Sequence, residues 1–113
     1  MAENIKIIYL FGYSERMGKH LERLIPLLKS QINKGSKIGL IFIHDGVINA
    51  TSKGKTPESV NELLGLNIAL YTLIPDLKAR GIALDHIHQK VVPIEYDQLV
   101  DIMDATPKVI SWM

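Results

Sequence analysis

Nearly continuous apolar runs of strand length alternate with helix-period segments along the chain, and this alternation constrains the fold most. Three such runs, rich in Ile and Leu, occupy residues 5–11, 37–44 and 67–73. Strands that helices cover on both faces have this continuous apolar character. Helical segments between such strands are typical of parallel pairing. The sequence therefore predicts an α/β domain with a mostly parallel sheet of about five strands.

The first helical segment is predicted over residues 15–33, with Ser14 as its N-cap and Gly35 just beyond its end. One stripe of apolar residues at three- and four-residue steps is expected to face the core: Met17, Leu21, Leu24, Leu28 and Ile32. Pro26 lies inside this pattern and is expected to kink or divide the helix, because it lacks an N–H donor.

The remaining elements follow from turn and capping residues. Residues 45–56 read as a loop, and Pro57 opens a short helix that runs to residue 64. Another short helix begins at Pro75, and a fourth strand is expected within residues 86–94. A helix over residues 96–104 and a strand over residues 108–112 complete the chain.

Right-handed crossovers predict a flavodoxin-like, three-layer, doubly wound domain with strand order 2-1-3-4-5. In such sheets the functional crevice lies at the carboxyl ends of the strands. We therefore expect the loop after the first strand to lie beside the loop after the third. The loop after the second strand is expected at the same end.

Composition excludes several classes of function. A chain of 113 residues fits one domain, spanning residues 1–113, and a net charge of +1 gives no electrostatic footprint for nucleic acid or a membrane. No secretory leader or run of about 20 apolar residues is present, so a cytoplasmic protein is expected. The sequence has no cysteine, which rules out disulfides, thiolate metal sites and a thiol nucleophile.

The segment from Gly12 to His20 is close to a phosphate-binding loop and lies correctly between a strand and a helix. However, five residues separate Gly12 from Gly18, whereas a true phosphate loop has four. His20 also occupies the place of the magnesium-binding hydroxyl. The segment therefore favours an ordinary loop and first helical turn over nucleotide hydrolysis.

His44 and Asp45 end the second apolar run, where a doubly wound fold displays its functional groups. A histidine beside a carboxylate can act as a tuned acid or base, although adjacent strand residues point to opposite faces. Together with Tyr13 and Ser14, this pair forms the candidate binding crevice. A structural or partner-facing role for His44 is favoured over catalysis.

His86 and His88 could share one face of a strand and bind a metal, but no motif supplies a third ligand. The sequence therefore predicts no metal site and no cofactor, and the role of this pair stays open. Trp112 is expected to be an interface anchor. No catalytic residue is assigned, which favours a protein that is not an enzyme.

Three blocks carry a resemblance to the DsrE/DsrF/DsrH-like sulfur-relay family. Residues 42–47, Phe-Ile-His-Asp-Gly-Val, look like its second strand and the turn that follows. Residues 70–81, which end in Asp-Leu-Lys-Ala-Arg-Gly, are similar to its third strand and short helix. Residues 94–100 and the Ser111-Trp112 pair resemble the end of the DsrH/TusB branch.

The resemblance implies a flavodoxin-like fold, a cytoplasmic setting and an oligomer. Family members pass persulfide sulfur between cysteines, in some cases toward tRNA 2-thiouridine. Without cysteine, this chain is expected to be a non-catalytic or regulatory subunit. Its partners would be further copies of itself or cysteine-containing DsrE-like paralogues. The alternative is a homo-oligomeric module that binds a small molecule or an anion in the crevice.

Overall fold

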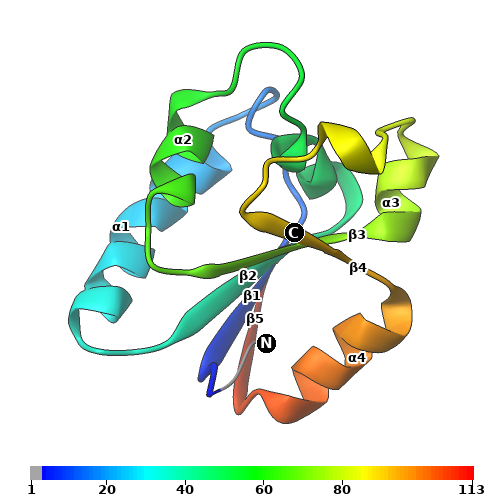
Figure 1. Cartoon of the computed structure of the whole chain (residues 1–113). Helices are drawn as coiled ribbons and strands as arrows, with labels where there is room; N and C mark the ends of the chain where they lie inside the picture. Colours follow the sequence, from blue (N-terminus) through cyan, green and yellow to red (C-terminus); the bar gives the residue numbers. More distant parts are fainter. Residues whose placement is uncertain (1–3) are drawn as a thin grey trace.

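The computed structural model describes residues 4–113, which form five parallel strands with helices on both sides of the sheet (Figure 1). The strands are β1 (Ile7–Phe11), β2 (Ile38–Phe42), β3 (Ala69–Leu73), β4 (Val91–Ile94) and β5 (Lys108–Trp112). The α-helices are α1 (His20–Asn33), α2 (Glu58–Leu64), α3 (Ile74–Ala79) and α4 (Tyr96–Ala105). Two 3₁₀ helices, η1 (His44–Ala50) and η2 (Leu84–His86), follow β2 and α3. The predicted flavodoxin-like α/β architecture is confirmed.

The expected strand order 2-1-3-4-5 is wrong in detail, because the strands lie in the order β4-β3-β2-β1-β5. Each of β2, β3 and β4 joins on the same side of the strand before it, and only β5 returns to the other side of β1. The order therefore reverses between β1 and β5. Hydrophobic periodicity defines each strand but not the neighbour beside which it inserts, so the sequence pattern left this order open.

The two faces of the sheet are covered unequally. One face packs its apolar side chains under α1, η1, α2 and α3, with Tyr9 and Phe11 at the centre of this layer. Of the helices that the structure describes, only α4 packs on the opposite face, through Leu99 and the partly buried Ile102 and Met103. In Figure 1, α1 and α2 lie to the left of the sheet and α4 to the lower right. Right-handed crossovers explain this division, because only the connection from β4 to β5 runs back across the sheet.

The start of α1 differs from the prediction. The helix begins at His20 rather than near residue 15, and Ser14 is not its N-cap. Met17, expected in the buried stripe, is 88% exposed in the preceding loop. Pro26 lies on the exposed side of a helix that continues past it to Asn33.

The end of α1 matches the prediction. Gly35 has a φ of +86°, which suits glycine. Its N–H donates to Ile32 O, and the N–H of Ser36 donates to Gln31 O. These two bonds form a Schellman motif, which satisfies carbonyls that the helix end would otherwise leave free.

Two connections expected from the sequence are also different. The first part of the loop predicted over residues 45–56 is the 3₁₀ helix η1, in which Val47 and Ala50 are buried. The strand expected within residues 86–94 is present as Val91–Ile94, but His86 and His88 do not belong to it, because His86 ends η2. Within residues 4–113, no helix is long and apolar enough to cross a membrane.

Candidate functional site

The loop after β1 carries Tyr13 and Ser14, two of the predicted site residues. The Tyr13 ring stacks on the His20 ring with centroids 3.7 Å apart and an interplanar angle of 15°. Ser14 is 4% exposed, and its hydroxyl oxygen accepts a 3.2 Å hydrogen bond from the backbone N–H of Arg16. Tyr13 therefore packs on the first residue of α1, and the Ser14 hydroxyl stabilises a local turn.

Asn49, in η1, holds this loop against the end of β2. Its Nδ2 donates to the carbonyl of Tyr13, and its Oδ1 accepts from the N–H of Glu15, both at 2.8 Å. Asn49 is buried, so these bonds supply the partners that a buried amide requires. Sequence reasoning missed Asn49. Its position could have indicated this role, because Asn49 is the one polar side chain in the otherwise apolar segment from Val47 to Ala50.

The N-terminus of α1 does not offer the free amides of a phosphate-binding loop. The Glu15 carboxylate accepts hydrogen bonds from the N–H groups of Leu21 and Glu22, each at 2.9 Å. Anions bind helix N-termini through such N–H groups, and here a side chain of the same chain takes their place. The geometry agrees with the ordinary loop inferred from the glycine spacing.

His44 lies at the start of η1 with a φ of +51°, a left-handed conformation that costs energy for a residue other than glycine. Its backbone N–H donates a 2.6 Å hydrogen bond to Oδ2 of Asp76. The imidazole Nδ1 lies 4.0 Å from the same oxygen, and the side chain is 63% exposed. The strained backbone thus presents an exposed imidazole next to a carboxylate at the end of the sheet.

The Asp45 carboxylate pairs with Arg80 and not with the His44 imidazole. Arg80 donates to Oδ1 of Asp45 through Nη2 at 2.9 Å and Nε at 3.2 Å, and its Nη1 reaches the carbonyl of Asp76 at 3.2 Å. Arg80 follows α3, so the pair links the end of β3 to η1. Asp76 and Arg80 therefore complete a cluster of which the sequence analysis named only His44 and Asp45.

Gly46 follows Asp45 because no larger residue fits. A Cβ at this position would lie 2.1 Å from the carbonyl oxygen of Phe11. That close approach accompanies the hydrogen bond from Ile43 N–H to Phe11 O, at 3.0 Å. The Asp-Gly pair thus serves packing of η1 on the end of β1, in addition to turning the chain.

The structure brings the predicted residues to one end of the sheet but divides them between two groups. Tyr13 lies in one loop with Ser14 and contacts His20 of α1 and Asn49 of η1, whereas His44 and Asp45 belong to the cluster with Asp76 and Arg80. The predicted order 2-1-3-4-5 implied that the loops after β1 and β3 are neighbours. They are not, because β2 lies between β1 and β3. η1 connects the two groups.

The chemistry available to the His44 cluster is limited. The imidazole Nδ1 lies 4.0 Å from Oδ2 of Asp76, which is too far for a hydrogen bond to orient the ring. Asp45 is neutralised by Arg80, and Ser14 has no histidine among its recorded hydrogen-bonding partners. The arrangement suits contact with a partner better than nucleophilic catalysis.

His86 and His88 lie in and after η2 rather than on one strand. Nε2 of His88 is buried and lacks a hydrogen-bonding partner among the described residues. Burial lowers the pKa of His88, and a backbone hydrogen bond with Thr51 partly opposes this shift. His86 lies with Nδ1 4.0 Å from Oδ1 of Asp85. No group of three or more His, Cys, Asp or Glu side chains within residues 4–113 could hold a metal.

Trp112, the predicted interface residue, is half-buried near the end of β5. Its ring stacks on Phe11 with centroids 6.4 Å apart and an interplanar angle of 22°. Its carbonyl accepts a 2.9 Å hydrogen bond from the N–H of Gly12. Trp112 thus packs partly inside the chain and keeps part of its surface exposed.

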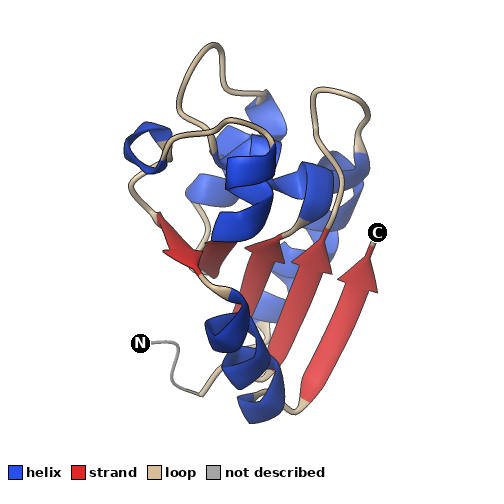
Figure 2. Ribbon diagram, turned by 90° about the vertical axis from the view of Figure 1, so that its right-hand side faces the viewer, coloured by secondary structure: helices blue, strands red, loops and turns tan. Residues whose placement is uncertain are grey.

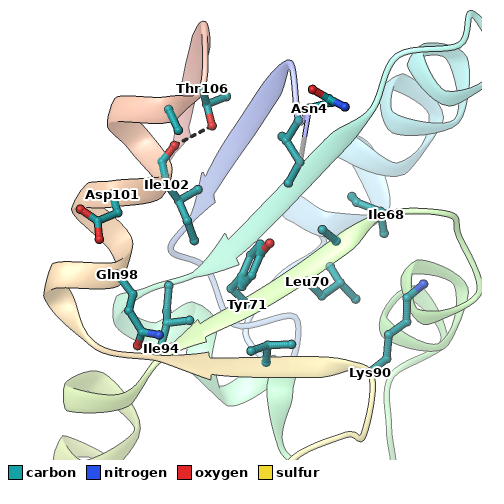
Figure 3. A pocket seen from close by; sticks show the side chains of 14 residues that line it. Asn4, Ile68, Leu70, Tyr71, Lys90, Ile94, Gln98, Asp101, Ile102 and Thr106 are labelled. Carbon is teal, nitrogen blue, oxygen red and sulfur yellow. Dashed lines mark hydrogen bonds between the residues drawn. The ribbon is translucent and has the colours of Figure 1, made fainter. Parts of the chain in front are cut away.

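A groove of about 900 Å³ lies away from the predicted crevice, between α4 and the sheet over β3 and β4 (Figure 3). Its lining includes Val92, Ile94 and Ile102 together with Tyr71, whose hydroxyl points toward the open space (Figure 3). Burial raises the pKa of this hydroxyl. None of Tyr13, Ser14, His44 and Asp45 lines the groove. It exists because α4 is the one described helix that covers this face of the sheet.

Comparison with solved structures supports the fold. The chain is similar to a protein of unknown function, MTH1491, from Methanobacterium thermoautotrophicum, with a TM-score of 0.73 and 15% identity over 94% of this chain and 96% of that chain. It is equally similar to the ychN protein from E. coli, with a TM-score of 0.73 and 19% identity over 95% and 98% of the two chains. At these identities the likeness concerns the fold alone.

Sequence comparison is more specific. The family model of DsrH like protein matches residues 19–109. Protein TusB from Pectobacterium parmentieri is 33% identical over 89 residues, which cover 79% of this chain and 86% of that protein. Protein TusB from Pectobacterium atrosepticum is 34% identical over 73 residues, or 65% and 73% of the two chains. The chain therefore belongs to the DsrH-like family and to its DsrH/TusB branch.

Proposed function

We propose that the chain is a non-catalytic or regulatory subunit of a sulfur-relay complex that transfers persulfide, with tRNA 2-thiouridine as one destination of the sulfur. In this proposal residues 1–113 act as one DsrE/DsrF/DsrH-like domain. The observation that carries it is membership of a sulfur-relay family by a chain that has no cysteine. A persulfide needs a thiol as its carrier, so the sulfur must travel on a partner.

The partner in this proposal is a cysteine-containing DsrE-like paralogue in the same cytoplasmic complex. The His44 cluster supports a contact at the carboxyl end of the sheet. His44 keeps an exposed imidazole in a strained conformation, and such strain concentrates at functional positions. A histidine near a partner's cysteine would favour its thiolate, which is the reactive form.

Affinity purification of the chain from its native cell tests the proposal. We expect recovery of a cysteine-containing paralogue with the wild-type chain and reduced recovery with His44→Ala. His86→Ala is the matched control, because His86 is also a substantially exposed histidine but lies outside the His44 cluster. Failure to recover any cysteine-containing relative would contradict the proposed function. Equal recovery with all three chains would remove His44 from the contact.

The alternative is a homo-oligomeric module that binds a small molecule or an anion. It has less support, because two residues expected to bind such a ligand, and the first amides of α1, have partners inside the chain. The Ser14 hydroxyl accepts from Arg16, Asp45 pairs with Arg80, and Glu15 occupies the first amides of α1. Calorimetric titration with sulfate or phosphate that gave saturable binding, abolished by His44→Ala, would favour this alternative.

A further inference from the structure

The sheet has two edges, and only one of them is blunted. At one edge, β4 is four residues long and contains Pro93, which cannot donate a backbone hydrogen bond. At the other edge, β5 pairs only with β1 among the strands of residues 4–113 and is the outermost strand beside the C-terminus (Figure 2). β5 contains no proline, and its one charged residue is Lys108. Natural proteins usually protect an edge of this kind.

The direction of the β5 backbone groups follows from two hydrogen bonds to the β1 side. Lys108 N–H donates to Lys6 O at 3.2 Å, and Gly12 N–H donates to Trp112 O at 2.9 Å. Backbone groups alternate in direction along a strand. The N–H and C=O groups of Lys108, Ile110 and Trp112 therefore point toward β1. The N–H and C=O groups of Val109 and Ser111 therefore point outward from the sheet.

Apolar side chains accompany this open edge. Val109 is 38% exposed on the face that α4 covers. On α4, Tyr96 and Val100 are 57% and 52% exposed. The opposite flank of α4 carries Gln98, Asp101 and Ala105, which line the groove over β3 and β4. At about 100° per residue, Tyr96 and Val100 lie on the other flank of the helix. The flank with Tyr96 and Val100 therefore faces the β5 edge, and the apolar surface continues from the strand onto the helix.

We propose that β5 pairs antiparallel with β5 of a second copy of this chain, about a two-fold axis at Ile110. In this register Val109 of each copy faces Ser111 of the other, and each such pair exchanges two backbone hydrogen bonds. Ile110 faces Ile110 as a non-hydrogen-bonded pair, as its inward-pointing backbone groups require. The inference goes beyond the proposed function, because it concerns contact between two copies and not contact with the cysteine-bearing partner.

The register is self-complementary, which favours a second copy as the occupant of the edge. Lys108 faces Trp112 of the other copy on the face that carries Ile110. The aliphatic stem of a lysine can cover the half-exposed indole, and its ammonium group is attracted to the ring. No like charges are opposed. Isologous contacts of this kind generate the two-fold dimers most common among soluble proteins.

Single introduced cysteines test the register without background, because the chain has none of its own. In Ile110→Cys the two cysteines face each other as a non-hydrogen-bonded pair with Cα atoms about 4.5 Å apart, within disulfide reach. In the control Val109→Cys they are roughly 8 Å apart, beyond the limit of about 7 Å. We expect a disulfide-linked dimer on mild oxidation for Ile110→Cys alone. Equal cross-linking of both variants, or none, would overturn the register.

Val109→Pro tests the pairing itself. The substitution removes an N–H that points outward, so the hydrogen bonds from β5 to β1 remain. The other edge strand, β4, already contains a proline, Pro93. Light scattering should give about 25 kDa for the wild type, twice the 12.7 kDa of one chain, and a monomer for the variant. Circular dichroism checks that the variant is folded. A wild-type monomer across the micromolar range, or a folded variant that remains dimeric, would overturn the proposal.

Discussion

The carboxylate of Asp76, in α3, accepts a 2.6 Å hydrogen bond from the backbone N–H of His44 and so joins the ends of β2 and β3. The bond accompanies the left-handed conformation of His44, whose φ is +51°. A carboxylate that accepts from a backbone amide makes one of the stronger hydrogen bonds in proteins. It therefore offsets part of the backbone strain.

Asp76→Ala should lower the free energy of unfolding by about 1.5–3 kcal/mol, because it removes a charged acceptor from a backbone donor. Urea denaturation followed by circular dichroism measures this change. Asp101→Ala is the control, since Asp101 is an exposed aspartate without a recorded hydrogen bond within residues 4–113. Equal losses in both variants would show that the bond to His44 contributes nothing.

Gly46→Ala should destabilise the fold by about 3 kcal/mol, because the new Cβ would overlap the Phe11 carbonyl oxygen at 2.1 Å. The neighbour is backbone and cannot turn away, so η1 must move. Gly65→Ala is the matched control: the nearest atom to its Cβ would be 3.5 Å away, and its φ is −85°. Thermal melting of both variants provides the measurement, and a normal melting temperature for Gly46→Ala would contradict the packing.

Glu15→Ala should cost about 1–2 kcal/mol of stability, the usual loss when a helix N-terminus loses its side-chain acceptor. The lost bonds are those from the N–H groups of Leu21 and Glu22. Glu58→Ala removes an exposed acid from the first turn of α2 and should change stability by less than about 0.5 kcal/mol. If the two variants lose the same stability in chemical denaturation, Glu15 is not the cap of α1.

The strands could be predicted because each is an apolar run with few alternatives. Residues 38–42 are all buried, and such a run forms a strand wherever a sheet covers both of its faces. The strand order could not be predicted in the same way. The choice between β1 beside β3 and β1 beside β5 depends on contacts between elements that local periodicity does not describe.

The candidate site was predicted in part for a related reason. His44 and Asp45 were found because they end a strand, a local feature. Asp76 and Arg80 were missed, because they reach η1 from 32 and 35 residues further along the chain. The capping role of Glu15 was also missed, since Ser14 is the more usual residue type for a cap. Only the folded loop shows which of the two side chains reaches the helix.

Stability should fall as the solution becomes acidic because of His88, whose pKa is lowered by burial. Above the ordinary value of about 6.5 the side chain is neutral in both the folded and the unfolded state, and its contribution is constant. Below that value the unfolded chain takes up the proton first, so stability is lost until the pH passes the lowered pKa. His88→Gln should flatten this part of a stability–pH profile measured with urea. A profile unchanged by the substitution would contradict the assignment.

The chain should not carry persulfide sulfur itself. A sulfane sulfur is held covalently by a thiolate, and no residue among the 113 supplies one. We expect that a cysteine desulfurase with ³⁵S-labelled cysteine leaves the purified chain unlabelled after denaturing gel filtration. A cysteine-containing DsrE-like protein treated in the same way is the positive control. When the two are mixed, all label should remain on the cysteine-containing protein. Label on this chain that survives denaturation and is released by dithiothreitol would contradict a non-carrier role.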